Sequence, residues 1–396
     1  MKYIILVGDG MPDTPVKELG NKTPLEFAKT PNMDLAASMG ICGTADFVPP
    51  SMKPGSDVAN LSLFGYDPLK YYTGRGPLEA ASMGVEIGDD DVAFRCNLVT
   101  IKDGIMDDYS AGHITTEEAR SLLETLGLKL GTSEIKFYPG ISYRHLCVIK
   151  GGARAAKCTA PHDISGKDIK KYLPSGEGAT LLNKLMEDSV EVLKKCKTNK
   201  DRIKKGNKPA TSIWLWGQGM KPTMPTYEEK YNITGSVITA VDLIKGIGVY
   251  AGLDVISVPG ATGYLDTNYK GKAQYALESL RVKDFVFVHV EAPDEAGHNG
   301  DIRGKVKSIE DFDKLVVGTI LKGMSGFKEW RLLITADHAT PLNIKTHSRG
   351  AVPFVICGTS IKKGTIKKFA EKEMAKSPLK ISKGYTLTSK FIKGDL

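Results

Sequence analysis

The chain has no long hydrophobic run and no targeting segment. None of its apolar stretches approaches the roughly 18 residues that a membrane-spanning helix needs. Its N-terminal apolar stretch is five residues long and carries no signal of the kind that precedes cleavage. We therefore expect a protein of the cytoplasm that has no membrane partner.

Closely spaced cysteines are also missing. The six cysteines are scattered along the sequence, at Cys42, Cys96, Cys147, Cys158, Cys196 and Cys357. Without close pairs they indicate neither a zinc knuckle nor a disulfide framework. We expect free thiols in a reducing compartment.

The net charge of +8 is modest, and much of it lies in one stretch, KKCKTNKDRIKKGNK, at residues 194–208. No aromatic residues interleave with these lysines to stack on bases, so we expect a solvated helix end and loop and no nucleic-acid partner. A mild positive field would also help to attract a small phosphorylated molecule. A non-catalytic protein that binds anions or nucleic acid remains a remote alternative.

Internal repeats and low-complexity segments are absent, and the 396 residues exceed one typical domain. Strand and helix signals alternate at both ends of the chain, which predicts a mostly parallel sheet with helices on both faces. A helix is expected over Lys305 to Leu321, with its buried stripe formed by Ile309, Phe312, Leu315, Val316 and Thr319. The expected strands are Tyr3 to Val7, Val255 to Val258, Phe285 to Val290, Leu332 to Ile334 and Phe354 to Ile356.

The middle of the chain has a different pattern and predicts an inserted α+β domain. Thr115 and Glu118 form a capping box before a helix that Gly127 is expected to stop. A second long helix is expected over Ala179 to Lys195, among strand-like runs at residues 92–101, 141–149 and 212–216. We expect the insert to span residues 81–224, with a core domain built from residues 1–80 and 225–396.

Aspartate and histidine cluster just beyond the predicted strands. Asp9 follows the first strand, while Asp294 with His298 and Asp337 with His338 follow two later ones. Because the carboxyl ends of parallel strands meet at one edge of a sheet, these side chains should converge there. The chain has seven histidines, and three of them fall between His298 and His347. Carboxylate and imidazole sets suit zinc, manganese or iron, and two adjacent sets suggest a two-metal site.

A serine hydroxyl is placed where such a site could use it. Ser56, in PGSDVANLSL, comes just before an apolar run that predicts a helix. A helix N-terminus favours a nearby phosphate, and coordination to a metal would make the hydroxyl a nucleophile at neutral pH. The alternative is that Ser56 is a simple N-cap.

Eight motifs carry a resemblance that spans nearly the whole chain and keeps its order. They are GDGMPD, TPNMD, PGSDVANLSLFGYDP, YTGRGPLEAASMGVE, DYSAGHI, EAPDEAGH, TADHATP and THSRGAVPF. Together they resemble the cofactor-independent phosphoglycerate mutases of the archaeal type, in the alkaline phosphatase superfamily. The resemblance implies an α/β, alkaline-phosphatase-like core with a parallel-rich central sheet flanked by helices, plus an inserted α+β domain.

The resemblance also implies a reaction and its ligands. A mutase of this family interconverts 2-phosphoglycerate and 3-phosphoglycerate without bisphosphoglycerate, through a phosphoserine that would form on Ser56. Two divalent ions, manganese, zinc or magnesium, are implied. One ion would be held by Asp294, His298 and His347, and the other by Asp9, Ser56, Asp337 and His338.

Residues that bind the rest of a small phosphorylated substrate are expected in the insert. His113, Arg144, His162 and Asp163 are polar groups in motif-like settings that could bind carboxylate or phosphate, although each could equally make a loop hydrogen bond. Lys272 is a candidate for neutralising a transferring phosphoryl group, or else a lysine of a helix surface. The oligomeric state is left open.

Trp216, in SIWLWGQG, departs from the family pattern, because we expect an arginine at this place in archaeal mutases. The segment looks like a bacterial branch of the family that has been proposed to contain homoserine kinases. A homoserine kinase, or another phosphotransferase or phosphatase of the superfamily, is therefore the alternative. No Walker-type glycine loop is present, so a kinase would have to rely on the metal pair.

Overall fold

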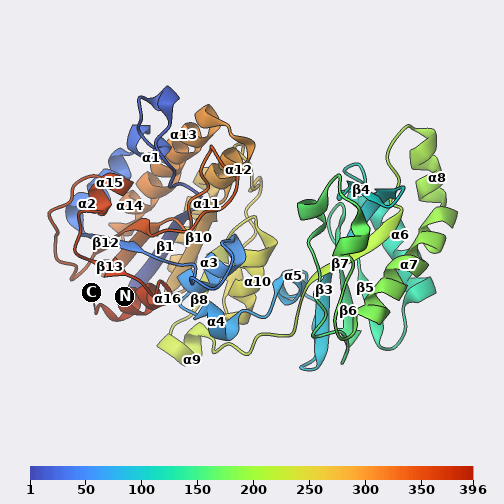
Figure 1. Cartoon of the computed structure of the whole chain (residues 1–396). Coiled ribbons are helices and arrows are strands. Elements are labelled where there is room, and N and C mark those ends of the chain that lie inside the picture. Colours follow the sequence, from blue (N-terminus) through green and yellow to red (C-terminus); the bar gives the residue numbers. More distant parts are fainter. Residues whose placement is uncertain (396) are drawn as a thin grey trace. The chain divides into compact units, whose positions relative to one another are not determined.

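The computed structural model describes residues 1–395, and its contacts divide the chain into two compact units. The core unit comprises Met1–Tyr72 and Met224–Leu396, and the inserted unit comprises Thr73–Thr223 (Figure 1). The first division lies ahead of α5 (Arg75–Ser82), whereas the expected bound, between residues 80 and 81, falls within this helix. Helix α5 packs on strands of the inserted unit and belongs with them.

The core unit is built on an eight-stranded sheet, within the described residues, in the order β13-β2-β12-β11-β1-β10-β8-β9. Neighbouring strands from β11 through β1 and β10 to β8 and β9 run parallel, whereas β12 is antiparallel to both of its neighbours. This arrangement confirms the predicted parallel-rich sheet. The strands are β1 (Lys2–Gly8), β2 (Ile41–Ala45), β8 (Gly235–Ile238), β9 (Asp254–Val255), β10 (Phe285–Val290), β11 (Trp330–Thr335), β12 (Val352–Gly358) and β13 (Lys380–Ile381).

Helices cover both faces of this sheet (Figure 1). One group contains α2 (Pro31–Met39), α11 (Tyr269–Leu280), α13 (Ile302–Asp311) and α14 (Gly318–Met324), and the other contains α3 (Ser56–Leu63), α10 (Asp242–Tyr250) and α16 (Tyr385–Lys393). The remaining core helices are η1 (Lys17–Leu19), α1 (Pro24–Phe27), α4 (Pro68–Tyr71), α9 (Tyr227–Tyr231), α12 (Ala292–Asn299) and α15 (Glu371–Met374). Strands β1, β10 and β11 are almost entirely buried between the two groups, as their apolar sequences predict.

The helix expected over residues 305–321 is interrupted by a π-helical segment, η4 (Phe312–Val317), between α13 and α14. A π turn holds one more residue than an α turn, so the buried stripe shifts along the sequence. Val317 and Ile320 are fully buried, whereas Leu315 and Thr319, expected on the stripe, are only partly buried. An unbroken period of 3.6 residues could not predict this shift.

The inserted unit is an α+β structure around a five-stranded antiparallel sheet within the described residues, in the order β4-β3-β6-β5 with β7 also pairing with β3. The capping box of Thr115 and Glu118 is confirmed, but Gly127 does not end the helix, which continues to Leu130. Its strands are β3 (Asp91–Lys102), β4 (Ile105–Asp108), β5 (Ile135–Tyr138), β6 (Arg144–Lys150) and β7 (Ser212–Gly219). Its helices besides α5 are α6 (Thr116–Leu130), η2 (Pro161–Ile164), η3 (Ile169–Tyr172), α7 (Ala179–Lys195) and α8 (Lys197–Lys204).

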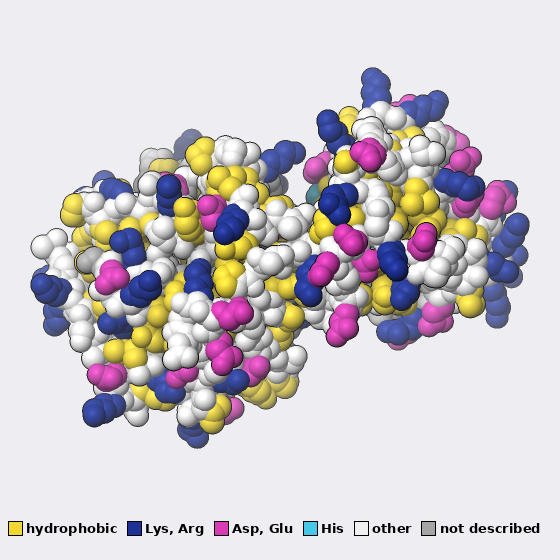
Figure 2. Space-filling model, turned by 90° about the horizontal axis from the view of Figure 1, so that it is seen from below, with side chains coloured by type: hydrophobic (Ala, Val, Ile, Leu, Met, Phe, Trp, Pro, Cys, Tyr) yellow, Lys and Arg dark blue, Asp and Glu magenta, His cyan; other side chains and the backbone are white. Residues whose placement is uncertain are grey.

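The cysteines and the helix lengths bear on the free thiols and the lack of a membrane span expected from the composition. All six cysteines are free, and in residues 1–395 no helix is long and apolar enough to cross a membrane. On the face shown in Figure 2, Lys and Arg side chains are interspersed with Asp and Glu. The basic stretch at residues 194–208 forms the end of α7, helix α8 and the loop that follows.

Candidate metal site at the strand ends

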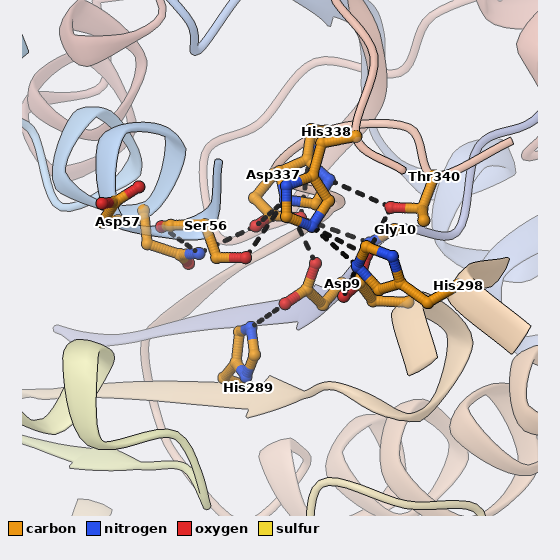
Figure 3. A network of polar contacts seen from close by, with 12 residues as sticks. Asp9, Gly10, Ser56, Asp57, His289, His298, Asp337, His338 and Thr340 are labelled. Carbon is orange, nitrogen blue, oxygen red and sulfur yellow. Dashed lines mark hydrogen bonds and ion pairs between the residues drawn. The ribbon is translucent and has the colours of Figure 1, made fainter. Parts of the chain in front are cut away.

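Three adjacent parallel strands deliver the predicted ligands to one edge of the core sheet. Asp9 directly follows β1, Asp337 and His338 follow β11, and Asp294 lies on α12 just after β10. The register aligns Val7 of β1 with His289 of β10, so these ends are level with one another. Figure 3 shows the side chains converging at this edge.

A first ligand group consists of Asp294, His298 and His347. The His298 Nε2 atom lies 3.2 Å from Asp294 Oδ2, and His347 Nε2 lies 3.5 Å from Asp294 Oδ1. The two Nε2 atoms are 3.0 Å apart. The Nδ1 atom of His298 lies 3.0 Å from the Lys345 carbonyl oxygen, which can only accept, so a proton on Nδ1 leaves the Nε2 lone pair facing the group. Three donor atoms that converge in this way can hold a metal ion.

The charges within this group depend strongly on one another. Burial opposes ionisation of Asp294, but hydrogen bonds with His298 and His347 outweigh it and hold the pKa of this carboxyl well below its usual range. The same bond with Asp294 raises the pKa of His298 to about 9. A divalent ion bound here would compete with the proton on His298.

A second group, Asp9, Asp337 and His338, is almost completely buried. The His338 Nε2 atom lies 3.3 Å from Asp337 Oδ2 and 3.6 Å from Asp9 Oδ1. Asp9 Oδ1 is buried and has no hydrogen-bond partner among the described residues. Burial, followed by the charges of Asp337 and Asp294, raises the pKa of Asp9 well above its usual value. A divalent cation would satisfy the orphaned oxygen and offset the repulsion, so this donor set fits a metal.

Ser56 presents its hydroxyl to the second group. Gly55 is the N-cap of α3 and Ser56 is its first residue, and no side-chain capping bond is made there. The Ser56 Oγ atom instead lies 3.2 Å from His338 Nε2. The geometry therefore favours a side chain aimed at the ligands over a simple N-cap.

Asn60 supports this arrangement and was not predicted from the sequence. It lies one turn after Ser56 on α3, and its Nδ2 atom donates to Asp337 Oδ2 at 2.8 Å and to the Ser56 carbonyl at 2.9 Å. The Gly10 backbone N–H donates to the other oxygen of Asp337 at 3.3 Å. The signal that could have identified Asn60 is its position four residues after a candidate nucleophile, within an apolar helix.

His289 was also missed. It lies fully buried in β10, with Nε2 2.9 Å from Asp9 Oδ2 and Nδ1 3.3 Å from Thr239 Oγ1. Burial lowers the pKa of His289 to about 3, so the imidazole is neutral. One histidine within the otherwise apolar run FVFVHV was the available signal.

Lys272, on α11, is not a lysine of the helix surface. Its side chain is fully buried, and Nζ donates to the His289 carbonyl oxygen at 3.0 Å. Burial lowers the pKa of Lys272 to about 8, against the opposing charge of Glu291. A buried amine beside the ligand edge fits the predicted electrostatic role better than the surface alternative does.

The predicted substrate residues of the inserted unit are partly brought together. His162 and Asp163 are exposed and lie 3.7 Å apart, and the His162 ring lies 5.3 Å from the Trp216 ring. Arg144 is exposed at the start of β6. His113 lies in a turn after β4, where its backbone N–H donates to Ser110 Oγ.

Two arginines that were not predicted surround Trp216. The guanidinium of Arg95 lies 4.6 Å from the Trp216 ring centre, and that of Arg75 lies 5.9 Å away. Burial, with the charges of Arg75 and Arg95 acting against the opposing charge of Asp163, lowers the pKa of His162. The place where we expected an arginine is therefore a tryptophan with guanidinium groups packed against it.

An α/β fold with a parallel-rich sheet and clustered carboxylate, imidazole and serine groups at its strand ends defines a protein with a candidate metal site. A family model described as 2,3-bisphosphoglycerate-independent phosphoglycerate mutase matches residues 37–199. A probable mutase of this name from Geobacter sulfurreducens is 53% identical over 392 residues, 98% of each chain. The Methanosarcina barkeri mutase is 56% identical over 361 residues, 91% of each chain.

Solved structures agree with these relatives. A Pyrococcus horikoshii protein matches with a TM-score of 0.84 and 32% identity, over 99% of this chain and 96% of that one. The cofactor-independent phosphoglycerate mutase of Thermoplasma acidophilum matches with a TM-score of 0.69 and 28% identity, over 99% of each chain. The chain therefore belongs to the family of 2,3-bisphosphoglycerate-independent phosphoglycerate mutases and is an enzyme of that family, as its motifs predict.

Proposed function

We propose that the chain interconverts 2-phosphoglycerate and 3-phosphoglycerate in the cytoplasm, without bisphosphoglycerate, through a phosphoserine formed on Ser56. The observation that carries the proposal is the position of Ser56 Oγ, 3.2 Å from His338 Nε2, at the start of α3 and beside two ligand groups. A nucleophile in this position suits phosphoryl transfer better than a purely structural metal site.

Two divalent ions are part of the proposal. Asp294, His298 and His347 would hold one. Asp9, Asp337, His338 and Ser56 would hold the other. These mixed carboxylate and imidazole sets suit manganese or zinc, with magnesium less favoured because of its preference for oxygen. Bound ions would lower the pKa of the Ser56 hydroxyl and offset the negative charge of the phosphoryl oxygens.

The chain's own groups account for the two halves of the reaction. The Ser56 hydroxyl gives up its proton and its Oγ forms a bond to phosphorus as the bond from phosphorus to the glycerate oxygen breaks, and that oxygen takes up a proton in exchange. In the second half, the neighbouring hydroxyl of the retained glycerate gives up a proton and attacks the phosphoserine, which restores the Ser56 hydroxyl. Lys272, buried with its Nζ on the His289 carbonyl, would contribute positive charge to this edge.

We further propose that the inserted unit binds the glycerate portion. Arg144, His162, Asp163 and His113 remain candidates for this role. To these we add Arg75 and Arg95 beside Trp216, although the buried Arg95 also pairs with Glu79, with Nε 3.1 Å from Oε1. Guanidinium groups bind carboxylate and phosphate in a bidentate manner, and Trp216 would hold them in place through its ring face. Its indole Nε1 is itself fixed by a hydrogen bond to Asn97 Oδ1 at 3.0 Å.

An assay coupled to enolase tests the proposal. Protein stripped of metal and then restored with manganese, zinc or magnesium should convert 3-phosphoglycerate without added bisphosphoglycerate. Ser56→Ala should lower kcat by at least about 10⁴-fold, because the nucleophile is lost. Ser51→Ala, an exposed serine five residues earlier, is the matched control and should retain activity.

The outcomes separate the alternatives. No turnover with any of the three metals would overturn the mutase proposal, and full activity of Ser56→Ala would overturn the phosphoserine. Transfer of label from ATP to homoserine by the same protein would favour the kinase instead. Binding of an oligonucleotide that weakens steeply with salt, with no turnover, would favour the binding protein.

A further inference from the structure

A chain of hydrogen bonds behind Asp9 distinguishes its two carboxylate oxygens. The Oδ2 atom lies 2.9 Å from His289 Nε2, whereas Oδ1 is buried without a hydrogen-bond partner among the described residues. In Figure 3, His289 approaches Asp9 from the side opposite to Asp337 and His338. The Oδ2 atom of Asp9 is therefore fixed by His289, and Oδ1 faces Asp337 and His338.

The proton positions along this chain follow from the groups involved. The Val241 backbone N–H donates to Thr239 Oγ1 at 3.0 Å, so this hydroxyl is free to give its own proton to His289 Nδ1, 3.3 Å away. An ionised Asp9, which is the form that binds a metal, can only accept, so the imidazole proton then lies on Nε2 and points at Asp9 Oδ2. Thr239 thus selects the tautomer that binds Asp9.

We propose that His289, oriented by Thr239, is a positioning residue that makes Asp9 a one-oxygen ligand and so sets the affinity of the Asp9, Asp337 and His338 group for its divalent ion. The inference rests on the proposed function, because it assigns a role towards a metal. His289 lies close enough to Asp9 and Asp337 to be a candidate ligand itself, but its Nε2 is engaged by Asp9 Oδ2 at 2.9 Å, so it acts on the ion through Asp9.

Burial and backbone contacts hold the arrangement in place. His289 has no exposed surface and Thr239 is only 5% exposed. The His289 carbonyl accepts the Nζ hydrogen bond of the buried Lys272, so the backbone of this residue is held as well. Asp337 is held in a comparable way by Asn60 and the Gly10 N–H, and Asp294 accepts a hydrogen bond from Thr340. Each ligand carboxylate thus has a partner that limits its rotation.

The experiment compares two substitutions at the same position. His289→Met keeps an apolar side chain of similar length but removes the donor, whereas His289→Gln places an amide N–H where Nε2 lies. The affinities of both sites for manganese are measured by isothermal titration calorimetry, together with the melting temperature of the chelated protein. Thr239→Val, which removes the hydroxyl and keeps the shape, is the companion variant.

We expect His289→Met to weaken one of the two sites by about 10- to 100-fold and to leave the other unchanged. His289→Gln should recover most of the loss, and Thr239→Val should fall between the parent and His289→Met. Unchanged affinities in His289→Met would overturn the inference. Equal losses at both sites would also overturn it, because they would indicate a general structural role, and failure of Gln to restore binding would overturn the assigned hydrogen bond.

The same titration separates this inference from the proposed function. A parent protein that binds two ions but does not convert 3-phosphoglycerate would remove the proposed function and leave the role of His289 standing. A parent protein that binds no ion would overturn both.

Discussion

Glu371 shows at the scale of a single residue how burial sets charge. Its carboxylate accepts hydrogen bonds from Thr23 Oγ1 at 2.8 Å and from the Asp13 backbone N–H at 3.2 Å. Burial nevertheless dominates these bonds and raises the pKa of Glu371 to about 7. The folded protein therefore retains a proton on this side chain at pH values where the unfolded chain has lost it.

We predict that this proton makes stability depend on pH. Between the unfolded pKa, about 4.5, and the folded value, about 7, the folded state binds more protons, so the free energy of unfolding should fall as the pH rises through this window. Glu371→Gln removes this titration. Over the same window, the free energy of unfolding of the variant should therefore fall by about 1–3 kcal/mol less than that of the parent. Urea unfolding at pH 4.5, 6 and 8 measures the difference.

The control for this prediction lies on the same short helix. Glu373 of α15 is partly exposed, and its hydrogen bond with Lys376 lowers its pKa, so Glu373→Gln should leave the stability loss of the parent between pH 4.5 and 8 intact. A parent protein and a Glu371→Gln variant with parallel stability curves would contradict the role given to burial.

Individual residues also show what the sequence could and could not predict. The sequence could identify four candidate site residues, because each follows a recognisable strand or begins a helix and lies in a motif of a known family. They are Asp9, Asp294, Asp337 and Ser56. His289 and Asn60 act through other side chains, and neither stands at the end of an element. Their roles depend on distances across the sheet, which sequence spacing does not contain.

At the scale of elements, one buried ion pair ties together the loops that carry the ligands. Lys305 of α13 donates to Asp13 Oδ2 at 2.7 Å and to the Thr340 carbonyl at 2.8 Å, and both charged side chains are fully buried. Asp13 also accepts from the Leu342 N–H at 3.2 Å. Because Thr340 donates through its hydroxyl to Asp294, the pair connects α13 and the loops after β1 and β11 to a ligand carboxylate.

We predict a large loss of stability when this pair is broken on one side. Asp13→Asn leaves the Lys305 ammonium buried without its counter-charge and should cost about 3–5 kcal/mol. Replacement of both residues, Asp13→Asn with Lys305→Met, should cost less than the single change. Chemical denaturation of the chelated proteins measures both.

The matched control is an exposed ion pair on the same helix, between Lys307 and Asp311 at 2.6 Å. Loss of an exposed pair spaced four residues apart should cost only about 0.3–0.5 kcal/mol. Equal costs for Asp13→Asn and Asp311→Asn would contradict the importance given to burial.

The elements themselves were predictable where their periodicity is simple. The run FVFVHV predicts β10, and the spacing of apolar residues predicts α7 with its observed bounds. The π segment was not predictable, because an extra residue in one turn is set by packing. In that segment, the Asp313 carboxylate accepts the Met33 N–H at the start of α2, a contact between residues 280 positions apart.

At the scale of the whole molecule, the two units differ in the groups that they contribute. The candidate metal ligands all lie in the core unit, whereas the inserted unit carries Arg75, Arg95, His162 and Trp216. The order of the motifs predicts this discontinuous arrangement. The bounds of the units were less predictable, because α5 belongs by packing to the unit that follows it.

We predict that metal binding protects the two units unequally. An ion that binds only the folded state at 100 times its dissociation constant stabilises that state by about 2.7 kcal/mol. Hydrogen exchange measured with and without manganese should therefore slow most in β1, β10 and β11, and change little in β3, β6 and β7. Equal slowing in both units would contradict the placement of the ions in the core unit.

The formation of phosphoserine on Ser56 is the central claim, and its most direct measurement is a quenched incubation. Metal-loaded protein is mixed with ³²P-labelled 3-phosphoglycerate, stopped with acid during turnover, and digested for mass spectrometry. We predict label on the peptide that contains Ser56, and none in Ser56→Ala. Continued conversion to 2-phosphoglycerate with an unlabelled protein would contradict the proposed mechanism.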